Sequence, residues 1–413
     1  MSSWKFTVAK LAEVRTRGNN RTRRLLLEEF AKKKEQKKQQ EQSNPNNAST
    51  NSTPPSSQSS SILSSVQLPV SFAKGYGDKS NGSSMDIDQN DTEEEVMEIE
   101  EFPFITPEEE TTLVHFYATK LFSLIGPKAQ HPPLRRDVKV ASTAALLLRR
   151  FYLSNSVMLY DPKVFMVACA FLATKVEDAT VNIRHLEDGT KIMKAHVTIP
   201  EIIKSEIHLA AGVDYDLLCL HPFKTVEAYT EDLRTFLKSR EGKLCVNRDW
   251  VGSADLRPLY DEARRIVEEL VVTDIPLIAT AGRIGLASLV LANERLVQKH
   301  GSQNNAPVET ESNKVTNNPE DGDGMNREEK DAIKIDFKGY LKMRFGSSHK
   351  ESDIDNIWNE IDNLCRIVRE MNINDETDMV VLKGIHKKLK KIRAGGEEKK
   401  KKKKKRKRTT DGD

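Results

Sequence analysis

The sequence predicts an all-α protein built from two helical bundles in tandem, and two apolar segments carry that prediction. Ten apolar residues run without interruption from Val164 to Ala173, and a second segment rich in small and apolar residues spans Ala279 to Leu296. A helix that is apolar on every side has no face for solvent, so each segment should lie at the centre of a bundle. The apolar–polar alternation that marks a β-strand does not recur at any length.

Clear start and stop signals delimit the first helix of the first bundle, which we expect over residues 102–221. Thr106 and Glu109 have the spacing of a capping box, in which each side chain accepts a hydrogen bond from the other residue's backbone N–H. Gly126 and Pro127 should end this helix. Its apolar face is expected to comprise Leu113, Phe116, Tyr117, Leu121, Leu124 and Ile125.

Four more helices complete the first bundle. The second spans about 137–153, and Asp161-Pro162 begins the third, because aspartate accepts from free N–H groups and proline has none to lose. The fourth is expected at about 184–195. Pro200 begins the fifth, whose buried face is predicted to comprise Ile203, Ile207, Ala210 and Ala211.

The second bundle is expected over residues 222–374. Three of its helices fall at about 222–237, 256–272 and 279–296, and a polar loop follows at 300–328. The next helix keeps helical spacing over four turns, through Ile354, Ile357, Trp358, Ile361, Leu364, Cys365 and Val368. A C-terminal helix is expected over 375–394, with Leu382, Ile385 and Leu389 on its apolar face.

The segments outside the bundles differ from them in composition. A short amphipathic helix is expected within residues 1–30, with Thr7 as its N-cap and Trp4, Phe6, Leu11 and Val14 on its apolar side. Residues 31–101 pass from Lys, Gln and Glu to Ser, Asn and Pro and then to acidic residues. Such a segment buries too little apolar area to fold, so we expect a disordered insertion that ends in a solvated acidic linker.

The charge of the chain is unevenly distributed. Its 413 residues carry a net charge of +3, and without the ten basic residues of the 395–413 tail the net charge would be −7. A basic run of this kind is typical of a nuclear import signal or of an arm that contacts nucleic acid. The run comprises Lys399, Lys400, Lys401, Lys402, Lys403, Lys404, Lys405, Arg406, Lys407 and Arg408.

The sequence lacks the residues that several classes of function require. The four cysteines form no C-x-x-C pair and lie in or near apolar runs, which predicts buried thiols in a reducing, intracellular compartment. The sequence shows no metal-ligand cluster, nucleophile–base pair or phosphate loop, so we expect no metal, no cofactor and no catalytic activity. The N-terminus lacks the apolar stretch of a secretory signal, and no segment reaches the length of a membrane span.

Four segments of the chain resemble the cyclin family. The most specific is RRFYLSNSVMLYDPKVFMVACAFLATKVED, from Arg149 to Asp178, and the next is VTDIPLIATAGRIGLASL at 272–289. Trp4-x-Phe6 and ETDMVVLKGIHKKL at 376–389 resemble the terminal helices of one cyclin branch. The resemblance covers about 4–20 and 102–393, and it implies two tandem five-helix cyclin folds with N- and C-terminal accessory helices.

The resemblance also implies a function. Cyclins bind a cyclin-dependent kinase and hold its regulatory helix in the active position, so this chain would be a regulatory subunit. The branch that it resembles pairs with the CDK-activating kinase and a RING-finger assembly factor. That trio acts on other cyclin-dependent kinases and on the RNA polymerase II tail, within a nuclear transcription and repair factor complex.

The family's kinase-binding positions fall on two stretches of this chain. The lysine and glutamate that usually anchor the kinase correspond to Lys175 and Glu206. The other implied contacts are Val176, Glu177, Asp178, Ala210, Tyr215 and Leu217.

Simpler interpretations of these residues stand beside the implied ones. A cation such as Lys175 complements the dipole at a helix C-terminus, and Glu206 fits a solvated helix edge. Glu177 and Asp178 do not form a catalytic acid pair, because adjacent helical residues point about 100° apart. For Arg149 and Arg150 the two interpretations are a phosphate-binding patch and a solvated helix end, and we favour the solvated helix end.

A second function class also uses tandem cyclin folds, namely DNA-bound initiation factors of the TFIIB type. Their usual N-terminal zinc ribbon has no counterpart here, because no cysteine precedes Cys169. We therefore expect neither a specific nucleic-acid site nor a membrane partner.

Overall fold

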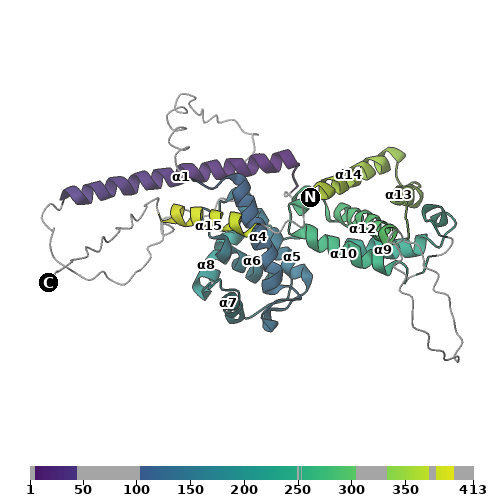
Figure 1. Ribbon diagram of the computed structural model, residues 1–413, viewed down its shortest axis with the longest axis horizontal. Coiled ribbons are helices and arrows are strands. Elements are labelled where there is room, and N and C mark those ends of the chain that lie inside the picture. The colour runs from purple at the N-terminus through teal and green to yellow at the C-terminus, as the bar shows by residue number, and fades with distance from the viewer. Residues whose placement is uncertain are drawn as a thin grey trace, which may run out of the picture.

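The computed structural model describes residues 5–43, 103–248, 251–252, 254–303, 333–371 and 378–394. These residues form α-helices and two short 3-10 helices, and their only β pairing is an isolated bridge between Val246 and Ile335. Two bundles lie side by side, and α1 and α15 lie along the first (Figure 1). The predicted all-α class and tandem arrangement are confirmed.

Most helix bounds follow the predicted ones, but α12 continues past 296 into the predicted 300–328 loop, and α11 and α13 were not predicted. The first bundle contains α4 (Pro107–Ile125), η2 (Pro132–Leu134), α5 (Val138–Ser154), α6 (Pro162–Val176), α7 (Ile183–Ile192) and α8 (Ile199–Gly212). The second contains α9 (Phe223–Phe236), η3 (Gly242–Cys245), α10 (Arg257–Val271), α11 (Ile275–Ile278), α12 (Ala281–Gln303), α13 (Phe337–Phe345) and α14 (Glu351–Glu370). The accessory helices are α1 (Val8–Ser43) and α15 (Met379–Arg393).

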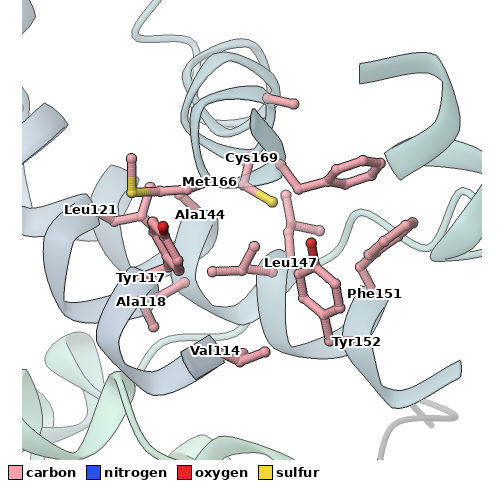
Figure 2. Packing of buried hydrophobic residues seen from close by; sticks show 14 of the residues in the cluster. Val114, Tyr117, Ala118, Leu121, Ala144, Leu147, Phe151, Tyr152, Met166 and Cys169 are labelled. Carbon is pink, nitrogen blue, oxygen red and sulfur yellow. The ribbon is translucent and has the colours of Figure 1, made fainter. Parts of the chain in front are cut away.

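Helix α6 lies at the centre of the first bundle, as its unbroken apolar run predicts. It packs against α4, α5 and α8, and Met166 and Cys169 point toward the side chains of α4 and α5 (Figure 2). Its Phe165 ring stacks on Phe151 of α5 with centroids 4.3 Å apart. The helix begins where expected, because the Asp161 carboxylate accepts a hydrogen bond of 2.9 Å from the Lys163 N–H.

Helix α12 has the corresponding place in the second bundle, between α9, α10 and α14. Its Gly285 lies so close to Thr225 of α9 that any side chain would collide there, which shows that the two helices are in close contact. A Cβ at Gly282 would meet nothing within 4 Å, so this second glycine does not serve packing.

The predicted buried face of α8 is wrong. Ile203 and Ile207 are 47% and 61% exposed, and the buried residues are Ile202, Ser205, Leu209 and Gly212. Helix α8 carries two apolar stripes, and the one that contains Ser205 and Gly212 packs on the neighbouring helices. A Cβ at Gly212 would clash with the Phe151 ring, which shows how tightly this stripe is packed.

The N-terminal helix is longer than predicted. Thr7 caps it as expected, since its Oγ1 accepts from the Lys10 N–H at 3.2 Å. The helix then continues past residue 30 to Ser43, because Lys, Gln and Glu are strong helix formers even without a core to pack on. Trp4, residues 44–102 with the acidic stretch, and the basic tail lie outside the described residues.

An ion cluster around the buried Arg149 joins α1 to both bundles. Arg149, predicted at a solvated helix end, is only 2% exposed, and its Nη1 lies 2.5 Å from Oδ1 of Asp274 in the second bundle. Arg15 of α1 donates two hydrogen bonds of 2.7 Å to the same carboxylate. Although burial alone would raise the pKa of Asp274, the charges of Arg149 and Arg15 hold it far below its usual range.

Arg150 is also buried, contrary to the prediction. Its guanidinium donates hydrogen bonds of 3.0 Å to the backbone carbonyls of Asp216 and Leu218, in the segment that connects the bundles. Both arginines of the pair therefore serve packing between segments that are distant in sequence.

A second polar junction lies where this connection enters the second bundle. The Thr143 hydroxyl donates to the Glu177 carboxylate at 2.6 Å and accepts from Nε2 of His221 at 2.7 Å. Burial lowers the pKa of His221 to about 4 although Glu177 lies nearby, so the imidazole is neutral at pH 7.

Replacing Asp274 with asparagine should destabilise the protein by about 3 kcal/mol, because Arg149 would remain buried without its counter-charge. The free energy of unfolding in urea measures this loss. Asp261→Asn is the matched control, since its pair with Arg257 is exposed and should change stability by less than about 0.5 kcal/mol. Equal effects of the two substitutions would contradict the role assigned to the cluster.

His221 should make stability fall in mild acid. Its pKa in the folded protein is about 4, below the ordinary value of 6.5, so protonation of the unfolded chain favours unfolding as pH falls below 6.5. At pH 5 this group should cost about 2 kcal/mol relative to pH 7. His221→Gln keeps a hydrogen-bond donor but does not titrate, so denaturation at the two pH values should show a smaller loss. An identical loss in both proteins would refute this assignment.

Candidate functional site

Lys175 and Glu206 come together on the surface of the first bundle. Lys175 is in the last turn of α6, Glu206 is in the middle of α8, and their Nζ and Oε1 atoms are 2.6 Å apart. The ammonium group also lies 4.0 Å from the centroid of the Phe171 ring. The packing of α8 on α6 therefore joins two residues that the sequence separates by 31 positions.

The Lys175–Glu206 pair contributes little to folding, because an exposed ion pair is worth about 0–1 kcal/mol. Its effect is to hold the ammonium group in one place. An ammonium has three N–H donors and Glu206 takes one, so Lys175 can donate to acceptors of another molecule.

An apolar stripe runs along α8 beside this pair. Ile203, Ile207 and Ala210 follow one another at i, i+4 and i+7, and therefore share one face of the helix. Tyr215, just beyond the helix, is 71% exposed and extends the stripe. We call Lys175, Glu206 and the stripe of Ile203, Ile207, Ala210 and Tyr215 the α8 surface.

The backbone at the edges of the α8 surface is strained. Asp178 after α6 and Asp214 and Tyr215 after α8 have φ values of 51°, 55° and 57°. These are three of the five non-glycine residues with positive φ in the described part of the chain. Such conformations persist where surrounding contacts impose them, often at binding sites.

The remaining predicted contact residues have different surroundings. The Glu177 side chain is 6% exposed and is bound by Lys139 and Thr143, so it is not available to another molecule. Val176 and Leu217 are half-buried against the first core. The structure thus presents Lys175, Glu206, Ala210 and Tyr215 together, with Asp178 exposed at their edge, and places Glu177, Val176 and Leu217 beneath them.

Ile203 and Ile207 are surface residues, although their apolar character predicts a place in the core. The sequence did carry a signal for this exposed face, namely the second apolar stripe of α8. A helix that packs on one side of a bundle needs only one apolar stripe. An exposed apolar stripe beside charged residues is typical of a protein-binding surface.

Other classes of site find no support in the described ranges. They contain no group of three His, Cys, Asp or Glu side chains that could hold a metal ion. All four cysteines are free and buried, which confirms the predicted buried thiols. Across these same ranges, every helix is too short or too polar to traverse a bilayer.

Comparison with known proteins gives several cyclins. The chain is 31% identical to "Cyclin CCL1" of Saccharomyces cerevisiae over 229 residues, which are 53% of each chain. It is 25% identical to "Cyclin-H1-1" of Arabidopsis thaliana, over 61% of this chain and 59% of that protein. It is 26% identical to "Cyclin-H" of Xenopus laevis, over 44% of this chain and 55% of that protein. The chain thus spans between half and three fifths of the length of these relatives.

Comparison with solved structures supports the fold. A chain of the CAK complex of Chaetomium thermophilum, bound to ATP-γ-S, aligns with a TM-score of 0.55 and 20% identity. The alignment covers 94% of this chain and 86% of that one. No protein-family model matches the sequence. The chain is thus similar in sequence to cyclins, including cyclin H proteins, and its tandem all-α fold is similar to that of a chain in the CAK complex.

Proposed function

We propose that this protein is a regulatory cyclin that binds and activates a cyclin-dependent kinase of the CDK-activating type. The observation that carries the proposal is the α8 surface, where an oriented ammonium group lies beside an exposed apolar stripe. Its kinase partner would act on other cyclin-dependent kinases and on the tail of RNA polymerase II. The similarity to cyclin H proteins supports this assignment.

The α8 surface suits a partner whose conformation it would fix, and not a substrate on which it would carry out a reaction. A kinase is active when the glutamate of its regulatory helix pairs with its ATP-binding lysine. Ile203, Ile207 and Tyr215 would pack on that regulatory helix, and Lys175 would donate to backbone carbonyls beside it. A surface held rigidly by α6 would thereby shift the kinase population toward its active conformation.

The finer features of the proposal concern the assembly and its location. The protein would act as a non-catalytic subunit, together with a RING-finger assembly factor, in a transcription and repair factor complex. Residues 399–408 would direct it to the nucleus as a basic import signal.

Reversing both charges of the pair, Lys175→Glu with Glu206→Lys, should keep the internal ion pair but abolish kinase binding. Affinity purification of the full chain from its own cells, followed by mass spectrometry, should recover a cyclin-dependent kinase and a RING-finger protein with the wild type. Kinase recovery should fall at least about tenfold with the variant, which is a loss of about 1.4 kcal/mol.

The matched control reverses another ion pair of the same bundle, Asp188→Lys with Lys191→Glu on α7, and should leave recovery unchanged. Unchanged kinase recovery with the Lys175 and Glu206 reversal would refute the proposed anchor. Recovery of a kinase without a RING-finger protein would assign the chain to another cyclin branch.

Replacing Ile203 and Ile207 with serine should weaken kinase binding without destabilising the fold. Both side chains are exposed in the free protein, whereas buried interface residues commonly contribute 1–3 kcal/mol each, or about tenfold in affinity. Calorimetric titration with the kinase and a thermal melt measure the two quantities. Val381→Ser, at an exposed position on α15, is the control, and a lower melting temperature with intact affinity would contradict the prediction.

A further inference from the structure

A polar junction holds the middle of α1 against the first bundle. The Arg21 guanidinium donates to the Ser154 carbonyl at the end of α5, and the Arg23 guanidinium donates to the Ile105 carbonyl at 3.1 Å, just before α4. Glu110 of α4 belongs to the same junction, because the charge of Arg23 acts on its carboxyl group. An acidic side chain thus lies among the contacts that dock α1.

One oxygen of the Glu110 carboxyl is an acceptor for two donors. Its Oε1 accepts hydrogen bonds from the Ser156 hydroxyl and, at 3.1 Å, from the Val157 N–H, both in the connection between α5 and α6. A neutral carboxyl group has one O–H donor beside its remaining acceptor sites. A proton on Glu110 therefore belongs on Oε2, which would become a donor.

A buried acceptor without a donor lies beside this carboxyl. Asn19 of α1 is 1% exposed, and its amide faces Glu110. The Asn19 Nδ2 donates to the Ile105 carbonyl at 3.0 Å, which fixes the orientation of the amide, because the flipped amide would set two acceptors against each other. Its Oδ1 is then buried and has no hydrogen-bond partner in the described part of the chain. Buried acceptors of this kind are rare in folded proteins.

The surroundings of Glu110 favour its neutral form. Burial raises the pKa of this carboxyl to about 7, although the hydrogen bonds that it accepts and the charge of Arg23 favour the carboxylate. Charged and titratable groups on the other helices that pack on α4 are engaged in other pairs, namely Lys388–Glu109, Arg393–Asp161, His386–Tyr117 and Arg149–Asp274. Arg23 is therefore the charge that opposes protonation of Glu110.

We propose that the Glu110 carboxyl is a proton-dependent latch for α1. As a neutral acid it donates from Oε2 to the Oδ1 of Asn19, while Oε1 keeps both of its donors. As a carboxylate it has no proton to donate, and two acceptors face each other between α4 and α1. The docking of α1 on the first bundle is therefore tighter below neutral pH than above it. This inference does not depend on kinase binding.

Hydrogen exchange of the full chain tests the latch. When α1 opens, Glu110 becomes exposed and its pKa returns from about 7 to the ordinary 4.5, so opening releases protons and is favoured as pH rises. The equilibrium constant for opening, from the exchange of the α1 amides corrected for intrinsic rates, should rise about tenfold between pH 6 and pH 8. The amides of α12 in the second bundle are the internal reference and should show no such rise.

Three variants separate the latch from other causes of pH dependence. Glu110→Gln keeps an acceptor for Ser156 and supplies an N–H donor for Asn19 without titrating, so its opening constant should stay within about twofold over this pH range. Glu108→Gln is the matched control, because it removes an exposed carboxylate of the same helix and should keep the tenfold rise. Asn19→Ala removes the acceptor and should reduce the rise to about threefold or less.

A carbon-13 titration of the Glu110 carboxyl, assigned by the resonance that Glu110→Gln removes, should have its midpoint near pH 7. A midpoint near 4.5 would overturn the proposal, as would a tenfold rise that persists in Glu110→Gln. An unchanged rise in Asn19→Ala would also overturn it, because burial of Glu110, and not its hydrogen bond to Asn19, would then cause the pH dependence.

Discussion

The carboxylate of Asp274 holds three parts of this protein together. It binds Arg149 of α5 and Arg15 of α1, which precede it by 125 and 259 residues. Removing Arg149 from water carries a large desolvation cost, and only a counter-charge in good geometry offsets it. All charges of the cluster are therefore paired in one arrangement of α1, the first bundle and the second bundle. Arg149 reinforces that arrangement with a hydrogen bond to the Val272 carbonyl of the second bundle.

Buried side chains also determine the shape of the α8 surface. Arg150 holds the connection after α8 by two backbone carbonyls, and Glu177 ties the end of α6 to Lys139 and Thr143. Neither side chain is placed to touch another molecule. Their contribution is to fix Lys175, Tyr215 and the stripe of α8 relative to one another, so that a partner would meet a rigid surface. A rigid surface shifts a partner's conformational equilibrium more effectively than one that adapts to it.

The N-terminal segment extends this pattern of long-range ties. Its Phe6 and Lys5 bind the turn around α11, its helix α1 crosses the first bundle, and Arg23 donates to the Ile105 carbonyl just before α4. One continuous segment therefore contacts both bundles. The relative orientation of the bundles would then depend on contacts at the extreme N-terminus as well as on the ion cluster.

The sequence by itself determined where the capped helices begin and which helix is central to each bundle. The Thr106–Glu109 capping box and the Asp161 cap are hydrogen bonds between residues two or three apart, and the all-apolar run of α6 leaves it no exposed position. The selection of Lys175 and Glu206 as binding residues followed from the resemblance, whereas their contact with each other comes from the packing of α8 on α6. Only the tertiary structure decided which apolar stripe of α8 is buried. It also decided that Arg149 and Arg150, for which charge alone predicts a solvated helix end, are buried. These outcomes depend on the partners that distant segments bring, such as Phe151 against Gly212 and Asp274 against Arg149. Local periodicity and charge carry no information about such partners, because the contact exists only after the helices have packed.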